Sequence, residues 1–205
     1  QLIFNSDKRM FIGELALDGR LRPVSGALPI TDSSKNLGFK EIYLPLENAN
    51  EASVVEGIDV YGVENLRDLV EHLSGRNTLP IFKSNKKIFQ KKSTYQFDLN
   101  QVRGQEHAKR AIEIAAAGAH NILLSGVPGS GKTMISRCIP SILPDLTIDE
   151  CLEVTRIYSV SGLTSKDNPL ILTRPFRSPH HTSSQVALVG GGAFPKPGEI
   201  SLSHR

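Results

Sequence analysis

The amino-acid sequence predicts an α/β protein, and two patterns support this fold class. Over residues 1–75, short apolar runs bounded by turn-forming residues alternate with helix-like segments. Further along, the apolar run 122–124 leads into a glycine-rich loop and then into a helix-compatible segment. The order strand, loop and helix is typical of an α/β core.

Composition and charge place the chain among ordinary globular proteins. It has 205 residues, 39% of them hydrophobic, with a net charge of +3 and an isoelectric point near 8.9. No apolar stretch approaches the roughly 18 residues that span a bilayer, so we expect a cytoplasmic protein without a membrane partner. The chain begins at Gln1 without a charged-then-apolar leader, which indicates a piece of a longer polypeptide. Cys138 and Cys151 are too few for a disulfide framework, and both are expected in the core.

The first 75 residues are expected to form a small α/β unit. Residues 9–17 form a strand-like run, closed as a hairpin by the turn dipeptide at 18–19. Strands are predicted over 41–46 and 57–63. Helices are predicted over 25–37, with a late start because of Pro29, and over 48–55. A third helix follows from the apolar spacing of Leu66, Leu69, Val70 and Leu73, and it ends at Gly75.

Residues 76–96 are predicted to be a basic linker between the units 1–75 and 97–205. This stretch contains six Lys and Arg residues and no acidic residue. It reads either as a solvated linker or as a nucleic-acid contact in which Phe82, Phe89 and Tyr95 lie among the lysines. The sequence leaves both interpretations open.

The glycine-rich loop satisfies the phosphate-binding pattern G-x-x-x-x-G-K-T in full. Its glycines permit backbone conformations that let consecutive N–H groups surround phosphates, and the following helix adds its own free N–H groups. The lysine is placed to reach the β- and γ-phosphates, and the threonine hydroxyl to ligate Mg²⁺. A turn that binds nothing is the alternative. The eight residues are Gly126, Val127, Pro128, Gly129, Ser130, Gly131, Lys132 and Thr133.

The segments around this loop read as helices. Residues 104–119 are alanine-rich with one apolar face, and Pro140 and Pro144 end the helix that follows the loop. Thr147 and Glu150 fit a capping box, so the pair Asp149–Glu150 is interpreted as a helix start. We therefore reject this pair as the catalytic acids that hold Mg²⁺, because no apolar strand precedes it.

The tail, residues 170–205, is rich in Gly, Pro, Ser and His. His180 and His181 are adjacent, and adjacent side chains of an extended segment point to opposite faces. Because no third ligand lies at a suitable spacing, we favour a packing or hydrogen-bonding role over a metal site.

Four long blocks resemble the magnesium-chelatase-like AAA+ ATPases of the ComM/YifB type, and together they cover nearly the whole chain. They read GELALDGRLRPVSGALP, LPLENANEASVVEGIDVYGVENLRDLVEHLSG, DLNQVRGQEHAKRAIEIAAAGAHNILLSGVPGSGKTM and RPFRSPHHTSSQVALVGGGAFPKPGEISLSH. The resemblance implies that residues 1–75 are the C-terminal part of a Lon-protease-like domain, related to ribosomal S5 domain 2. It implies that residues 97–205 are the N-terminal part of an incomplete P-loop AAA+ αβα core.

The same resemblance implies a function. It indicates an ATP-driven, ring-forming motor that uses Mg²⁺, is hexameric, and acts on DNA as a helicase in branch migration during natural transformation. Adenine contacts are implied at Val102, Arg103, Gly104 and Gln105, and an insertion facing the pore or substrate at 190–200. The acidic motif, sensors and arginine finger are expected beyond Arg205, so the catalytic residues are unknown and this piece is expected to hydrolyse ATP poorly.

Three other readings stay open. A chelatase motor subunit shares the fold, although such subunits lack the Lon-like domain. A nucleotide-dependent assembly module would bind ATP without turnover. A Lon-like peptidase would use a serine and a lysine. The block resembling Lon's lysine-bearing segment, 19–24, has arginines that cannot act as a base, so we expect the protease-like fold without protease activity.

Overall fold

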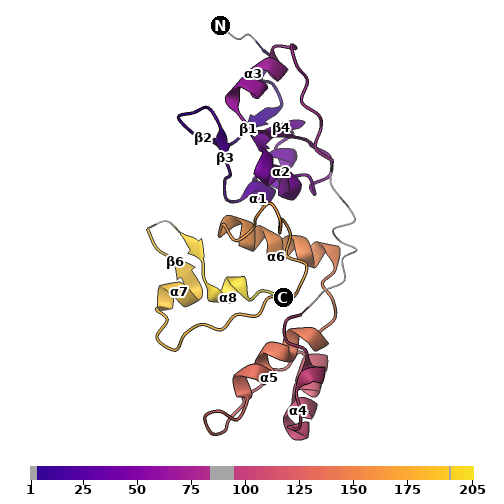
Figure 1. Cartoon of the computed structure of the whole chain (residues 1–205), viewed down its shortest axis with the longest axis vertical. Coiled ribbons are helices and arrows are strands. Elements are labelled where there is room, and N and C mark those ends of the chain that lie inside the picture. The colour runs from indigo at the N-terminus through magenta and orange to yellow at the C-terminus, as the bar shows by residue number, and fades with distance from the viewer. Residues whose placement is uncertain (1–3, 84–94, 194) are drawn as a thin grey trace.

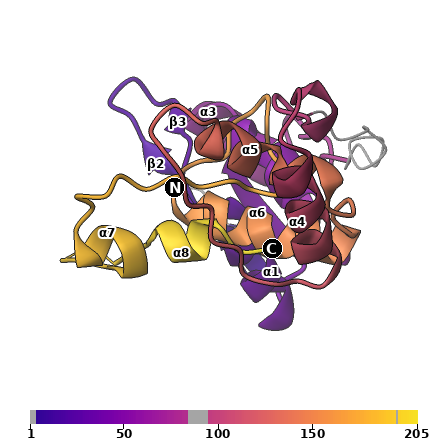
Figure 2. The same ribbon diagram turned by 90° about the horizontal axis from the view of Figure 1, so that it is seen from below.

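The structure is a computed structural model that describes residues 4–83, 95–193 and 195–205. Its parts follow one another along the long axis of the molecule (Figure 1). The N-terminal unit lies at one end, the helices α4 and α5 lie at the other, and α6 lies between them. An arm containing α7 and α8 extends to one side of this axis in both views (Figures 1 and 2).

The N-terminal unit is built on a three-stranded parallel sheet in the order β1-β4-β5. Its strands are β1 (Arg9–Phe11), β4 (Glu41–Pro45) and β5 (Asp59–Val63). Burial of β4 is nearly complete, as its apolar sequence requires of a central strand. Helices α1 (Ala27–Asn36) and α2 (Leu46–Ala52) supply the crossover segments, and α3 (Leu66–Leu73) follows β5. The small α/β unit predicted from the sequence is confirmed.

The predicted hairpin is only partly correct. Residues 9–17 do not form one strand, because β1 joins the parallel sheet and the chain then leaves it. The hairpin is instead the short antiparallel pair β2 (Glu14–Leu15) and β3 (Leu21–Arg22), joined by a turn in which Gly19 has φ +85°. A glycine tolerates this left-handed conformation at no steric cost.

The second hydrophobic core holds the segments on either side of the glycine-rich loop. Its elements are the 3-10 helix η2 (Leu99–Gln101), α4 (Glu106–Ala117), α5 (Lys132–Cys138) and the 3-10 helix η3 (Ile139–Ile142). The predicted helix over 104–119 is confirmed as α4, and α5 ends before Pro140 as expected. Leu99, Val102, Ile112, Ile135 and Cys138 form the buried cluster.

The strand expected at residues 122–124 is absent from the described structure. Ile122 and Leu124 pack against the second core, but Leu123 is 91% exposed. Strand backbone must exchange hydrogen bonds with a neighbouring strand, and no described strand lies beside this segment. The apolar run therefore packs on the core without joining a sheet.

Helix α6 (Ile148–Val160) joins the remaining parts, because it packs against α1 on one side and α8 on the other. Beyond it come α7 (Gln185–Val189), the strand pair β6 (Gly190–Gly191) and β7 (Lys196–Pro197), and α8 (Glu199–Leu202). Of the described residues within 190–200, which the resemblance assigns to an insertion, Gly190–Gly191 and Lys196–Pro197 form the strand pair and residues 199–200 begin α8.

Most of the predicted basic linker, residues 84–94, lies outside the described residues. At its start, the Phe82 amide donates to the Val60 carbonyl at 2.7 Å, and the Phe82 ring packs on the N-terminal core. Among the residues that the structure describes, no helix has both the length and the apolar character that crossing a bilayer requires.

Candidate nucleotide-binding site

The glycines of the loop over residues 126–133 give its backbone a curved path, and Lys132 bonds back to the start of the loop. Gly129 and Gly131 have φ values of +80° and +88°, which side chains with a Cβ rarely adopt. The Lys132 ammonium donates to the carbonyl oxygens of Gly126 at 2.8 Å and Val127 at 2.7 Å. A Cβ on Gly126 would lie 3.3 Å from the Ser130 hydroxyl oxygen. The loop therefore curls around the amino group that its motif assigns to phosphate.

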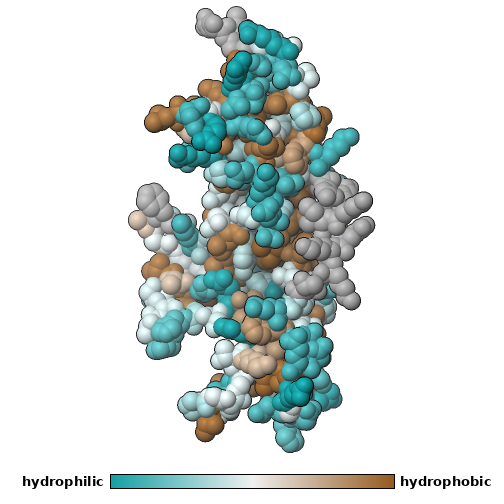
Figure 3. Space-filling model, viewed as in Figure 1, coloured by the Kyte–Doolittle hydropathy of each residue, from teal (hydrophilic) through white to brown (hydrophobic). Residues whose placement is uncertain are grey.

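The helix that follows the loop is anchored in the second core by one of its faces. Ile135 and Cys138 of α5 are buried in the second core, whereas Thr133 and Met134 face solvent on the same helix. Burial raises the pKa of the Cys138 thiol, which keeps it a neutral core side chain. Val127, at the free side of the loop, is 73% exposed. Hydrophobic surface is visible at this end of the molecule (Figure 3).

The segment implied to contact adenine lies against the same core. Val102 is 6% exposed and belongs to the cluster that contains Ile135. Gly104 and Gln105 follow with φ values of +67° and +59°, so the chain turns sharply at the start of α4. Arg103, between Val102 and Gly104, is exposed. One hydrophobic cluster thus contains Val102 of the first predicted segment and Ile135, which lies two residues after the second.

Glu150, of the acidic pair at 149–150, forms a capping box with Thr147, as the sequence indicated. The Thr147 hydroxyl accepts from the Glu150 amide at 3.2 Å, and the Glu150 carboxylate accepts from the Thr147 amide at 2.9 Å. These bonds, led by that from the Thr147 backbone, lower the pKa of Glu150. Its carboxylate is therefore occupied by the cap and by the nearby Arg205 at 3.6 Å.

The histidine pair has a geometry that the sequence did not predict. The two rings do not point to opposite faces; their centroids are 4.2 Å apart because the chain enters a turn at His181. His180 Nδ1 lies 2.7 Å from the Thr182 hydroxyl oxygen, which confirms the hydrogen-bonding role. In the described part of the chain, no group of three or more His, Cys, Asp and Glu side chains is placed to hold a metal.

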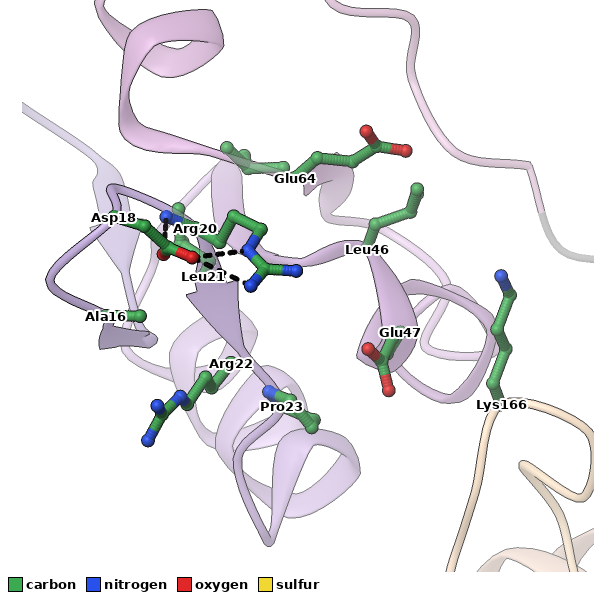
Figure 4. Close-up of a pocket in the computed structure, with 11 residues that line it drawn as sticks. Ala16, Asp18, Arg20, Leu21, Arg22, Pro23, Leu46, Glu47, Glu64 and Lys166 are labelled. Carbon is green, nitrogen blue, oxygen red and sulfur yellow. Dashed lines mark hydrogen bonds and ion pairs between the residues drawn. The ribbon is translucent and has the colours of Figure 1, made fainter.

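A pocket of about 370 Å³ lies on the N-terminal unit (Figure 4). It is found at residues 19–24, which resemble the lysine-bearing segment of Lon. Arg20 lines it, but its guanidinium is paired with Asp18 at 2.7 Å. Hydrogen bonding to Asp18 raises the pKa of Arg20 further, so this side chain cannot act as a base. Glu47, Glu64 and Lys166 also line the pocket.

Two sets of charged contacts were not predicted from the sequence. Arg177 makes a bidentate pair with Glu199, at 2.5 and 2.6 Å, which ties the extended segment after α6 to α8. Arg205 donates to Glu153 of α6 at 2.7 Å. The partners are 22 and 52 residues apart, so no local spacing could reveal them.

Comparison with known proteins places this geometry in context. The family model described as "Magnesium chelatase, subunit ChlI" matches residues 98–205, and a second, "Subunit ChlI of Mg-chelatase", matches residues 2–48. Competence protein ComM of Haemophilus influenzae is 43% identical in an alignment of 201 positions, which covers 94% of this chain and 38% of that protein. The uncharacterized protein YifB of Escherichia coli is 41% identical over 97% of this chain and 38% of its own length. An archaeal Lon protease of Archaeoglobus fulgidus is 37% identical over 54 residues, or 26% of this chain and 9% of that protein. The chain thus spans about two fifths of the length of ComM and YifB.

Proposed function

Because the chain belongs to the magnesium-chelatase-like AAA+ ATPases, in the group that includes ComM and YifB, we propose that residues 126–133 bind ATP. The observation that carries this proposal is the Lys132 ammonium, which lies inside a glycine loop on two carbonyl oxygens. A cation held in this way can turn from the carbonyls to phosphate oxygens, which carry full charge and bond it more strongly.

Mg²⁺ fits the same site through Thr133. The Thr133 side chain is exposed at the start of α5, next to the lysine, and a hydroxyl oxygen is a ligand that Mg²⁺ accepts. Bound Mg²⁺ supplies charge neutralisation at the phosphates. The residues of this chain then orient the nucleotide: Lys132 at the terminal phosphates, and Val102, Gly104 and Gln105 on the adenine side.

For the whole protein we propose a ring-forming ATPase motor, a hexamer, that remodels DNA in recombination linked to natural transformation. The name of the Haemophilus influenzae relative, a competence protein, supports a role of this kind. The match to the Lon protease fits the Lon-like N-terminal domain of this group, whereas the match of residues 2–48 to a family described as "Subunit ChlI of Mg-chelatase" keeps a chelatase motor subunit as the second candidate.

One experiment tests both the site and the motor. We expect DNA to stimulate ATP hydrolysis by the full-length protein, and Lys132→Ala to lower ATP affinity by about tenfold or more, since bonds to charged groups contribute roughly 1.5–3 kcal/mol each. Titration with a fluorescent ATP analogue measures the affinity, and phosphate release with and without DNA measures the turnover. Lys166→Ala, which removes an exposed lysine far along the chain, is the matched control.

Each alternative gives a different result. Unchanged ATP affinity in Lys132→Ala contradicts the site. ATP binding without turnover under any stimulus favours an assembly module, and turnover that ignores DNA but responds to a porphyrin substrate favours a chelatase motor. Peptide cleavage that survives the loss of Lys132 would indicate a peptidase.

A further inference from the structure

A buried carboxylate lies at the centre of the contact between the N-terminal unit and α6. Glu51, on α2, is 3% exposed. One of its oxygens accepts from the Leu28 amide of α1 at 2.9 Å and from the Ser159 hydroxyl of α6. The other accepts from the Thr164 hydroxyl, just after α6, at 3.0 Å. A single side chain therefore receives donors from both parts of the molecule.

Backbone and charged contacts surround this carboxylate. The Gly26 amide, at the start of α1, donates to the Ser159 carbonyl at 3.0 Å. Arg156 pairs with Asp32 across the same two helices at 3.1 Å. Gly162 has φ +69°, and a Cβ there would lie 3.0 Å from the Ser25 hydroxyl oxygen. The two surfaces therefore approach closely and match each other group by group.

The buried Glu51 carboxylate favours this one arrangement of α6 on the N-terminal unit. A carboxylate removed from water is costly unless hydrogen bonds replace its hydration, and here two of its three donors come from the α6 side. Separation of the two surfaces would leave the Ser159 and Thr164 hydroxyls without this acceptor. Thr31, Thr155 and Ser159, each 0% exposed, show how completely water is excluded from the surrounding helices.

Helix α6 carries the arm on its other side. The Tyr158 hydroxyl donates to the Leu202 carbonyl of α8 at 3.0 Å, and Glu153 binds Arg205 at 2.7 Å. In Figure 1, α6 accordingly lies between the N-terminal unit and α8. Contacts that hold α6 against the N-terminal unit therefore also hold the arm in place, because α8 is bonded to α6.

We propose that Glu51 locks α6 onto the N-terminal unit, so that this unit, α6 and the arm move as one body. The N-terminal unit then sets the position of the arm through α6. This role is separate from nucleotide binding, because none of the residues involved belongs to the loop 126–133.

Amide hydrogen exchange on the full chain tests the lock. We expect Glu51→Ala to speed exchange at the Gly26 amide, whose acceptor is on α6, by about tenfold or more, since hydrogen bonds to a charged group are lost. Exchange along α6 should rise with it, whereas the β4 amides should stay protected. Glu47→Ala is the matched control, because Glu47 is an exposed carboxylate on the same helix.

Two outcomes overturn the proposal. If Gly26 exchanges equally in Glu51→Ala and Glu47→Ala, the carboxylate does not hold the contact. If the β4 amides lose protection together with Gly26, Glu51 stabilises the fold of the N-terminal unit and not its contact with α6. Should Glu51→Ala not fold, Ser159→Ala decides, because it removes a donor from the α6 side: faster exchange at Gly26 supports the lock, and unchanged exchange overturns it. ATP affinity stays unchanged in all these variants, which separates this test from that of the nucleotide site.

Discussion

At the scale of single residues, His72 shows how hydrogen bonds fix a protonation state. The Leu79 amide donates to His72 Nδ1 at 2.9 Å, so this nitrogen carries no proton. The proton of the neutral ring is then on Nε2, which lies 3.1 Å from the Tyr43 hydroxyl oxygen, and that hydroxyl donates to Glu41. Burial, together with the charge of Arg9, lowers the pKa of His72, while Glu41 opposes this.

This arrangement predicts an acid-sensitive N-terminal unit. Because the pKa of His72 is lower in the folded state than in the unfolded chain, the unfolded state binds the proton first as pH falls. The contribution of His72 is complete above about pH 6.5 and is lost as pH drops below that value, at no more than about 1.4 kcal/mol per pH unit. Urea unfolding at several pH values between 7.5 and 5 measures the loss.

His72→Asn is the control for this prediction. The asparagine oxygen can accept from the Leu79 amide in place of Nδ1, but the side chain does not titrate. We expect the variant to lose less stability than the wild type over the same pH range. Equal pH dependence in the two proteins would show that His72 does not carry the effect.

At the scale of single elements, the capping box decides where α6 begins. Thr147 and Glu150 satisfy each other's amides, as their spacing in the sequence predicted. Thr147→Ala removes one of these bonds and should lower the free energy of unfolding by about 1 kcal/mol, the usual cost of losing an N-cap. Chemical denaturation followed by circular dichroism gives this value.

Thr147→Ser keeps the capping oxygen and should retain nearly all of the stability. If the serine variant loses as much as the alanine variant, the methyl group of Thr147 matters more than its hydroxyl.

An element-scale expectation that was wrong is the strand at 122–124. Its apolar residues met the sequence criterion, but a strand depends on a neighbour elsewhere in the chain.

At the scale of the whole molecule, two separate hydrophobic clusters organise the described chain. The first surrounds Ile42, Leu44 and Val60 in the N-terminal sheet. The second surrounds Ile112 and Ile135 and supports the glycine loop. A ligand that binds one of these parts stabilises that part by a free energy that grows with the logarithm of the ligand concentration relative to the dissociation constant.

If ATP binds at Lys132, its effect should therefore be local. Saturating Mg²⁺-ATP should slow amide exchange in α4 and α5 by about tenfold or more, because occupancy at 100 times the dissociation constant is worth roughly 2.7 kcal/mol. Amides of β4 and β5 should change little. Equal protection of both clusters would show that nucleotide binding reaches the N-terminal sheet, and no protection at all would contradict the binding site.

The sequence alone was sufficient for whatever depends on neighbours along the chain. The spacing of Gly126, Gly131 and Lys132, the capping box at Thr147 and the amphipathic helix α3 each rest on contacts within a few residues. The tertiary structure decided the rest: the parallel register of β1 with β4, the packed histidine pair, and the burial of Glu51 against Ser159. Glu51 and Ser159 are 108 residues apart. A carboxylate in an otherwise ordinary helix gives no local sign of burial, because its desolvation and its donors exist only once distant segments pack together.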